Sequence, residues 1–237
     1  DGHPKLPDLR LSPGLHNSMT IDVLRIENVL QSNKRSQLYN VVDNESGEAF
    51  CMKTPSVNYN DDAAYIERFI LEGWIGHRIN NPHVLKIAGF NRPKKYLYYL
   101  TEYIDGITLE QWIKENPKPP VQDVIVIIQQ VLKGLRAFHR RETIHQDLKP
   151  GNIMLDRYGE AKIIDFGSCH VKAIAEIATP LERDGILGTA TYAAPEAVLE
   201  GKSLQQSDIF SVAVILFEML TKQLPFYLIA HICCGRN

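Results

Sequence analysis

The residue pattern of the 237-residue chain changes near its middle from strand-rich to helical, and this change limits the folds that the chain can adopt. The first half contains short β-rich runs. They span residues 21–29, 37–42, 49–53, 84–90 and 96–103. One helix is predicted among them, over residues 61–79, from apolar side chains at three- and four-residue steps. After Gly106 the pattern is helical, and apolar stripes over 123–138 and 207–220 predict two buried helices. The chain therefore predicts an α+β fold with two lobes, a small antiparallel sheet lobe with one helix and a mainly helical lobe.

Domain boundaries follow from the same change in pattern. Residues 1–18 contain turn-forming residues and mixed charge without periodicity, which predicts a linker. The strand-rich lobe is then expected over 19–104 and the helical lobe over 105–226, while 227–237 matches no expected element. An interface between two such halves is a common place for a ligand cleft.

Charge and cysteine content exclude several classes of protein. The 26 basic and 28 acidic side chains give a net charge of −2, so no overall basic field would hold nucleic acid or an anionic membrane. The longest apolar stretch, 209–220, is too short to span a bilayer and contains Glu218. The four cysteines have no metal-binding spacing, which predicts free thiols in a reducing compartment. We therefore expect a cytoplasmic domain, which is compatible with a membrane-anchored parent protein.

The residues most suited to chemistry lie in two short segments of the second half. Asp147, Lys149 and Asn152 sit in a turn before an apolar run, and Asp165 ends the next apolar run. Two carboxylates and one carboxamide are ligands that Mg²⁺ prefers, with water and phosphate completing its shell. Lys149 adds a compact cation of the kind that neutralises a transferring phosphoryl group.

These segments resemble the eukaryotic-type serine/threonine protein kinase family. The resemblance covers about 21–226 and consists of five ordered features. They are Lys53, Glu72, His145-x-Asp147 with Asn152, Asp165-Phe-Gly, and Ala194-Pro-Glu196. It implies a bilobal protein-kinase-like fold, incomplete at its C-terminal end, that transfers the γ-phosphate of ATP with Mg²⁺ to Ser/Thr hydroxyls of protein substrates. Other segments are similar to the kinase half of bacterial bifunctional kinase/phosphatase proteins, which implies signalling and a metal-dependent phosphatase domain upstream.

The resemblance also implies a role for each site residue. Asp147 would be the catalytic base and Lys149 would contact the γ-phosphate, while Asn152 and Asp165 would hold Mg²⁺. Lys53, paired with Glu72, would hold the α- and β-phosphates. The adenine would contact the remaining residues implied by the resemblance, namely Leu30, Leu38, Cys51, Thr101, Glu102, Ile104 and Met154. Asp208 would brace the catalytic loop, and Thr189 would help to position Asp147 and Lys149.

Departures from the family pattern leave alternatives open. The phosphate-covering loop has Gln31, Asn33 and Ser36 where the family has glycines, and Gln146 replaces the usual arginine. The first departure and the short C-terminal lobe suggest an alternative, a pseudokinase or regulatory ATP-binding module. The second predicts activity without activation-loop phosphorylation. A small-molecule kinase is a third reading, which the Ala194-Pro-Glu196 segment disfavours.

Overall fold

The computed structural model describes residues 10–12, 14–59, 62–89, 92–171 and 191–225. The chain forms two compact units. Unit 1 comprises Asp1–His77 and Lys86–Tyr103, and unit 2 comprises Arg78–Leu85 and Ile104–Asn237. The division falls one residue before the expected 104/105 boundary, but residues 78–85, expected in the first lobe, belong to unit 2.

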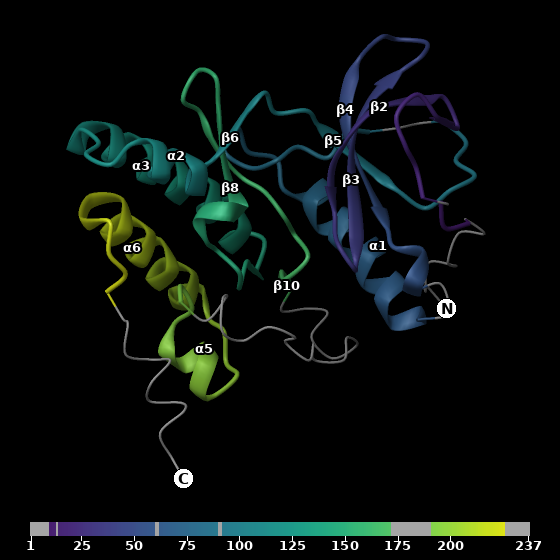
Figure 1. Ribbon diagram of the computed structural model, residues 1–237. Helices are drawn as coiled ribbons and strands as arrows, with labels where there is room; N and C mark the ends of the chain where they lie inside the picture. Colours follow the sequence, from purple (N-terminus) through teal and green to yellow (C-terminus); the bar gives the residue numbers. More distant parts are fainter. Residues whose placement is uncertain (1–9, 13, 60–61, 90–91, 172–190, 226–237) are drawn as a thin grey trace. The chain divides into compact units, whose positions relative to one another are not determined.

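Unit 1 is built on a five-stranded antiparallel sheet (Figure 1). Its strands follow the order of the sequence across the sheet. They are β1 (Thr20–Ile21), β2 (Leu24–Ser32), β3 (Ser36–Asp43), β4 (Ala49–Pro55) and β5 (Tyr99–Glu102). The helix α1 (Ala63–Arg78) packs beside the sheet, after a 3₁₀ turn at Val57–Tyr59. The antiparallel sheet with one helix confirms the predicted architecture of the first lobe.

The turn between β3 and β4 forms because one carboxylate satisfies its backbone. Asp43 Oδ1 accepts hydrogen bonds from the amides of Glu45 at 2.9 Å and Ser46 at 3.4 Å. Gly47 follows with φ of +71°, a conformation that glycine adopts without steric cost. The hairpin predicted at 43–47 is confirmed.

Residues 10–12 and 14–21 make contacts with the rest of unit 1, which differs from the linker expected over 1–18. Leu15 and Ile21 are buried in a hydrophobic cluster with Tyr39. The Arg10 amide donates to the Lys95 carbonyl at 3.1 Å, and the Leu15 amide donates to the Tyr39 hydroxyl at 3.4 Å. These contacts join residues far apart in sequence, so local periodicity could not reveal them.

The strand predicted over 84–90 is not formed in residues 84–89, the part that the structure describes. Val84 bridges Ile163 in unit 2, whereas Ile87 bridges Thr101 in unit 1. The segment therefore divides its backbone hydrogen bonds between two partners and builds no continuous ladder. The strand expected over 96–103 is shorter than predicted and begins at Tyr99.

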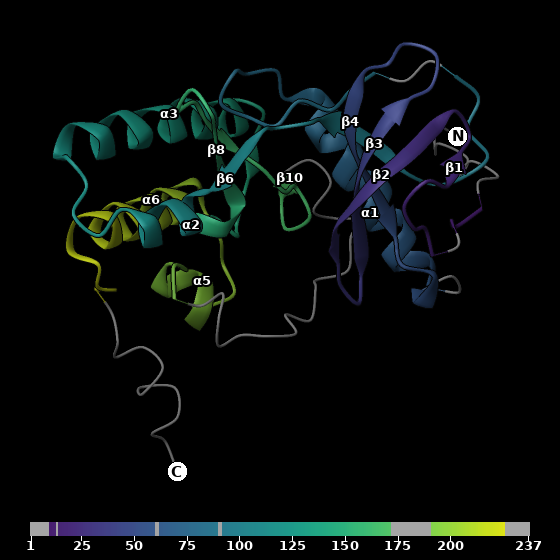
Figure 2. The same cartoon turned by 45° about the horizontal axis from the view of Figure 1, so that its top comes forward.

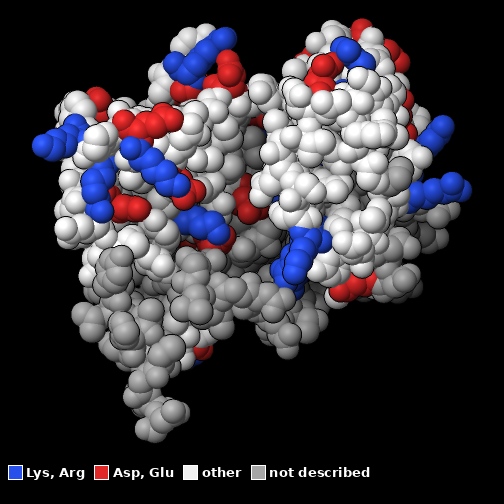
Figure 3. Space-filling model, viewed as in Figure 1, with Lys and Arg blue, Asp and Glu red and all other residues white. Residues whose placement is uncertain are grey.

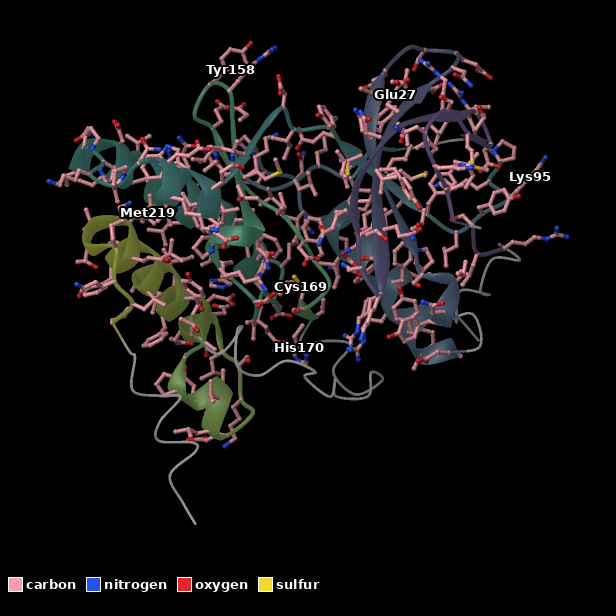
Figure 4. All side chains as sticks on the ribbon, viewed as in Figure 1. Glu27, Lys95, Tyr158, Cys169, His170 and Met219 are labelled. Atoms are coloured by element: carbon pink, nitrogen blue, oxygen red, sulfur yellow. The ribbon has the colours of Figure 1, made fainter. Side chains whose placement is uncertain are left out.

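Unit 2 combines helices with two small sheets. Its first sheet joins β6 (Gly106–Thr108), β8 (Ile153–Asp156) and β9 (Ala161–Ile163), and its second joins β7 (Thr143–Ile144) and β10 (His170–Val171). The helices are α2 (Leu109–Glu115), α3 (Val121–His139), α5 (Pro195–Leu199) and α6 (Gln205–Thr221), with a 3₁₀ turn at Pro150–Asn152. Tyr158 stands at the tip of the β8–β9 turn and points away from unit 2 (Figure 4).

Two long helices, α3 and α6, run alongside each other in unit 2 (Figure 2). The apolar stripe predicted on α3, which starts at Val124 and ends at Phe138, is buried. Val121, Ile125 and Leu132 lie off this stripe and are exposed. The helix begins at Val121, directly after Pro120 and two residues before the predicted start. No helix of the described residues is long and apolar enough to cross a membrane.

Candidate active site

The register of unit 1 places four predicted site residues on one face of the sheet. Leu38 pairs with Lys53 across β3 and β4, and Cys51 pairs with Thr101 across β4 and β5. Paired residues point to the same side of a sheet, and so do residues two apart on one strand. Leu38, Cys51, Lys53 and Thr101 therefore share a face. Lys53 Nζ forms an ion pair with Glu72 of α1, whose carboxylate is buried. The pair predicted from the sequence is thus formed.

The other residues of unit 1 that are predicted to contact the adenine differ in their surroundings. Leu30 is exposed and lies at a β-bulge between Val29 and Gln31. The Glu102 amide donates to the Lys86 carbonyl at 3.0 Å, so this amide has a partner within the protein. Burial raises the pKa of the Cys51 thiol, which fits a packing residue rather than a reactive one.

The β2–β3 turn folds without glycine because a side chain closes it. Asn33 Oδ1 accepts from the amides of Arg35 at 2.9 Å and Ser36 at 2.7 Å, and the Asn33 amide donates to the Ser36 carbonyl at 3.1 Å. All residues from Gln31 to Leu38 have negative φ. The backbone here therefore does not need the conformations that glycine provides.

In unit 2, the predicted catalytic residues form a hydrogen-bonded cluster around Asp147. Its Oδ2 accepts from Lys149 Nζ at 2.8 Å and from Asn152 Nδ2 at 3.0 Å. The same Asn152 nitrogen donates to the Asp147 carbonyl at 2.8 Å. Asp147 Oδ1 is buried and has no hydrogen-bond partner among the described residues. One carboxylate oxygen is thus fixed by two donors, and the other has none within the part of the chain that the structure describes.

Asn152 and Asp165 are brought together by the pairing of β8 and β9. Ile153 pairs with Ile163, and the Ile164 amide donates to the Asn152 carbonyl at 2.9 Å. Asp165 follows directly, in a left-handed conformation with φ of +69°. Because the Asn152 amide nitrogen is used on Asp147, its oxygen is turned away from that contact. This carboxylate and carboxamide fit Mg²⁺, which takes few ligands from the protein. The described residues contain no cluster of three or more acidic, His or Cys ligands.

A buried carboxylate on α6 holds the backbone of the catalytic loop. Asp208 Oδ2 accepts from the His145 amide at 2.9 Å, and its Oδ1 accepts from the Gln146 amide at 2.9 Å. The brace predicted from the sequence is therefore formed. His139 Nε2 lies 2.8 Å from Asp208 Oδ2, a third contact that sequence reasoning missed. His145 packs its ring edge-on against Phe138, and neither ring nitrogen has a hydrogen-bond partner in the described part of the chain.

The remaining predicted residues lie in unit 2 or outside the described residues. Met154 lies on β8, half-buried and opposite Lys162 and Thr108. Glu196 accepts a hydrogen bond from the Ser207 hydroxyl at 2.7 Å. Thr189 and the 227–237 segment lie outside the described residues. On the face seen in Figure 3, basic and acidic side chains are interspersed over unit 2, with no extended field of one sign.

The fold and the ordered motifs agree with comparisons to known proteins. Residues 27–232 match the protein kinase domain family, so the chain belongs to the protein kinases. It is 32% identical over 197 residues to the serine/threonine-protein kinase PknL of Mycobacterium bovis, which is 83% of this chain and 49% of that protein. It is 28% identical over 169 residues to the serine/threonine-protein kinase PrkC of Bacillus subtilis, covering 71% of this chain and 26% of the relative. The probable serine/threonine-protein kinase PknB of Lactococcus lactis is 32% identical over the same shares.

The family assignment confirms the resemblance to protein kinases inferred from the sequence and the α+β kinase fold. The chain spans about half the length of PknL and about a quarter of the other two relatives. The relatives are named as serine/threonine kinases, which favours that reading over the regulatory-module alternative.

Proposed function

We propose that this chain is a serine/threonine protein kinase that transfers the γ-phosphate of ATP to hydroxyl groups of protein substrates. The observation that carries the proposal is the Asp147 carboxylate. Its Oδ2 is fixed by Lys149 and Asn152, and its buried Oδ1 has no hydrogen-bond partner among the described residues. A carboxylate held in this way keeps one oxygen that can accept the proton of an attacking hydroxyl.

The other residues serve the phosphates in this proposal. The Lys53 ammonium, held by Glu72, binds the α- and β-phosphates, and Lys149 stabilises negative charge near the γ-phosphate. Asn152 and Asp165 hold Mg²⁺ through their oxygens. Bound Mg²⁺ supplies charge neutralisation to the phosphates. Leu30, Leu38, Cys51, Met154 and the Thr101–Ile104 segment contact the adenine.

The test compares two carboxylate-to-amide substitutions in the purified full chain. Asp147→Asn should lower phosphate transfer from radiolabelled ATP to a basic protein by about 10²–10⁴-fold, because the amide cannot accept the proton. Asp123→Asn, an exposed change in the first turn of α3, is the matched control and should leave the rate unchanged. Phosphoamino-acid analysis should find phosphoserine and phosphothreonine.

Two outcomes would overturn the proposal. Equal transfer by Asp147→Asn and the parent chain would remove Asp147 as the base. Binding of Mg-ATP by the parent chain, seen as a thermal shift, without any transfer would favour a regulatory ATP-binding module.

We also propose that activity does not depend on phosphorylation of the activation loop. Gln146 occupies the position at which an arginine cation would bind a phosphorylated loop residue, and an amide cannot form that charge-assisted contact. Treatment of the purified protein with a phosphatase, followed by removal of that enzyme, should leave the initial rate unchanged. A collapse of the rate would contradict this.

The last proposal concerns the domain organisation and location of the parent protein. The similarity of several segments to bacterial kinase/phosphatase proteins supports a metal-dependent phosphatase domain upstream of Asp1. The cysteines, which have the pattern of free thiols in a reducing compartment, support a cytoplasmic location for the kinase. The parent gene sequence tests the first point, since a phosphatase domain should be encoded before residue 1. Fractionation of cells that express the tagged parent protein tests the second.

A further inference from the structure

Tyr99 of β5 makes a contact with the Lys53–Glu72 pair that the sequence did not predict. The Tyr99 hydroxyl donates to Glu72 Oε1 at 2.7 Å, and Lys53 Nζ contacts the same oxygen. Lys53 and Tyr99 are direct register partners across β4 and β5, so their side chains are neighbours on one face. The Glu72 carboxylate is thus held by an ammonium from one strand and a hydroxyl from the next.

The ring of Tyr99 packs against one face of α1. It packs against Phe69 with the ring centroids 5.3 Å apart. A Cβ added at Gly73 would lie 3.3 Å from Cδ1 of the ring, which is tighter than ordinary contact. Phe69 and Gly73 are four residues apart and therefore share a face of the helix. The small residue at 73 leaves room for the ring beside Glu72.

This arrangement addresses the difficulty of holding a buried carboxylate in one orientation. Glu72 is 6% exposed, and its side chain has several rotatable bonds. A second donor on the same oxygen limits the carboxylate to the orientation that faces Lys53. The hydroxyl comes from a rigid ring with few rotamers, so the contact costs little conformational entropy.

We propose that Tyr99 is a positioning residue that acts through Glu72 to hold Lys53 ready for the nucleotide phosphates. The proposal rests on the proposed kinase function for its kinetic consequence and on unit 1 alone for its structural one. Tyr99→Phe keeps the ring on Phe69 and removes only the hydroxyl. It should raise KM for ATP by about tenfold, with a smaller change in kcat, because a hydrogen bond to a charged group is lost.

The neighbouring tyrosine provides a matched control. The Tyr98 hydroxyl donates to Asp22 at 3.0 Å, away from Glu72, and Tyr98 is buried in the cluster that contains Leu100. Tyr98→Phe therefore also removes one hydroxyl–carboxylate hydrogen bond from unit 1. It should leave KM for ATP within twofold of the parent chain.

A double-mutant cycle separates positioning from general stabilisation. If Tyr99 acts through Glu72, Tyr99→Phe should have no further effect on KM in a Glu72→Ala background, which lacks the acceptor of the Tyr99 hydroxyl. Gly73→Ala should raise KM in the same direction as Tyr99→Phe, since the added methyl group crowds the ring. Equal, additive effects of Tyr99→Phe in both backgrounds, or a parent-like KM for Tyr99→Phe, would overturn the proposal.

Hydrogen exchange gives a readout that does not depend on catalysis. Backbone amides of α1 around Glu72 should exchange about tenfold faster in Tyr99→Phe and at the parent rate in Tyr98→Phe. If the parent chain transfers no phosphate, the proposed function fails, but this measurement still decides the role of Tyr99. Unchanged exchange in Tyr99→Phe would contradict that role.

Discussion

Asp208→Asn should destabilise unit 2 far more than an amide in place of a carboxylate usually does. Asp208 is 1% exposed and takes three contacts, the His145 amide and His139 Nε2 on Oδ2 and the Gln146 amide on Oδ1. An asparagine has one oxygen and one NH₂ group. Whichever way it is turned, at least one backbone N–H of the catalytic loop faces another donor.

The expected cost follows from that count. With the amide oxygen in the place of Oδ2, two contacts survive, and the Gln146 amide is left buried without an acceptor. An unsatisfied buried donor costs about 1–3 kcal/mol, and loss of the charge weakens the surviving contacts. We therefore expect the free energy of unfolding to fall by about 3 kcal/mol, within the range for breaking a buried charged network. The rate of phosphate transfer should fall as well. The hydrogen bond from the Gln146 amide to Asp208 helps to hold Gln146 at its φ of +68°, directly before Asp147.

The two tryptophans make a sharp assay possible. Trp74 lies on α1 in unit 1, and Trp112 lies on α2 in unit 2. Urea unfolding followed by fluorescence in a Trp74→Phe background reports on unit 2 alone. Glu218→Gln on the same helix is the control, because a glutamine oxygen can still accept the single hydrogen bond from the Tyr192 hydroxyl. A loss below about 0.5 kcal/mol for Asp208→Asn, or one equal to that of Glu218→Gln, would refute the reasoning.

Three smaller predictions concern other parts of the fold. Arg92→Ala should lower the stability of unit 1 by about 1–3 kcal/mol at pH 7, measured by urea unfolding, because the guanidinium lies 2.9 Å from the buried Asp43 carboxylate. Gly134→Ala should lower that of unit 2 by about 1–3 kcal/mol despite its gain in helix propensity, because the added Cβ would lie 2.5 Å from the His83 carbonyl oxygen. Asn33→Ala should raise KM for ATP about threefold or more, because the β2–β3 turn loses the acceptor that closes it.

Each of these predictions has its own control. Burial acts to raise the pKa of Asp43, but hydrogen bonds from the Glu45 amide, Arg92 and the Ser46 amide outweigh it and hold the pKa below its ordinary value. The stabilisation is therefore present above the unfolded pKa, about 3.9, and disappears as pH falls through the lower folded value. An Arg92→Ala effect that does not shrink as pH falls below the unfolded pKa would contradict the ion-pair explanation. Asn33→Ser keeps a neutral acceptor in the turn and should raise KM less than Asn33→Ala does. A neutral or stabilising Gly134→Ala would refute the steric argument.

The sequence predicted those parts of the fold in which the signal is local. The α3 stripe from Val124 to Phe138 repeats with helical periodicity, and Asp147, Lys149 and Asn152 stand within six residues of one another. Such patterns can be recognised without a structure because neighbours along the chain become neighbours in space.

The parts that the sequence did not predict depend on register and long-range contact. Lys53 and Tyr99 become neighbours only because β4 and β5 pair in one register, and no spacing along the chain encodes this. Leu15 is buried against Tyr39, although its turn-rich surroundings are typical of a linker. The His139–Asp208 contact likewise joins two helices, α3 and α6. The residues next to His139 and Asp208 in the sequence give no sign of this contact.

The positions of residues with positive φ bear on whether a phosphate-covering β2–β3 turn without glycine is compatible with catalysis. From Gln31 to Leu38 the φ angles are negative and Asn33 closes the turn, so the missing glycines leave no strained residue there. Six other non-glycine residues of the described ranges have positive φ, and two of them, Gln146 and Asp165, lie on either side of Asp147 and Asn152 in the sequence. Such conformations persist only where the surroundings hold them, here Asp208 for Gln146 and a contact from the Gly167 amide at 3.1 Å for Asp165. Conformational cost therefore falls at Gln146, beside the proposed base Asp147, and at Asp165, the carboxylate proposed to hold Mg²⁺, whereas the β2–β3 turn carries none and needs only to keep its hairpin.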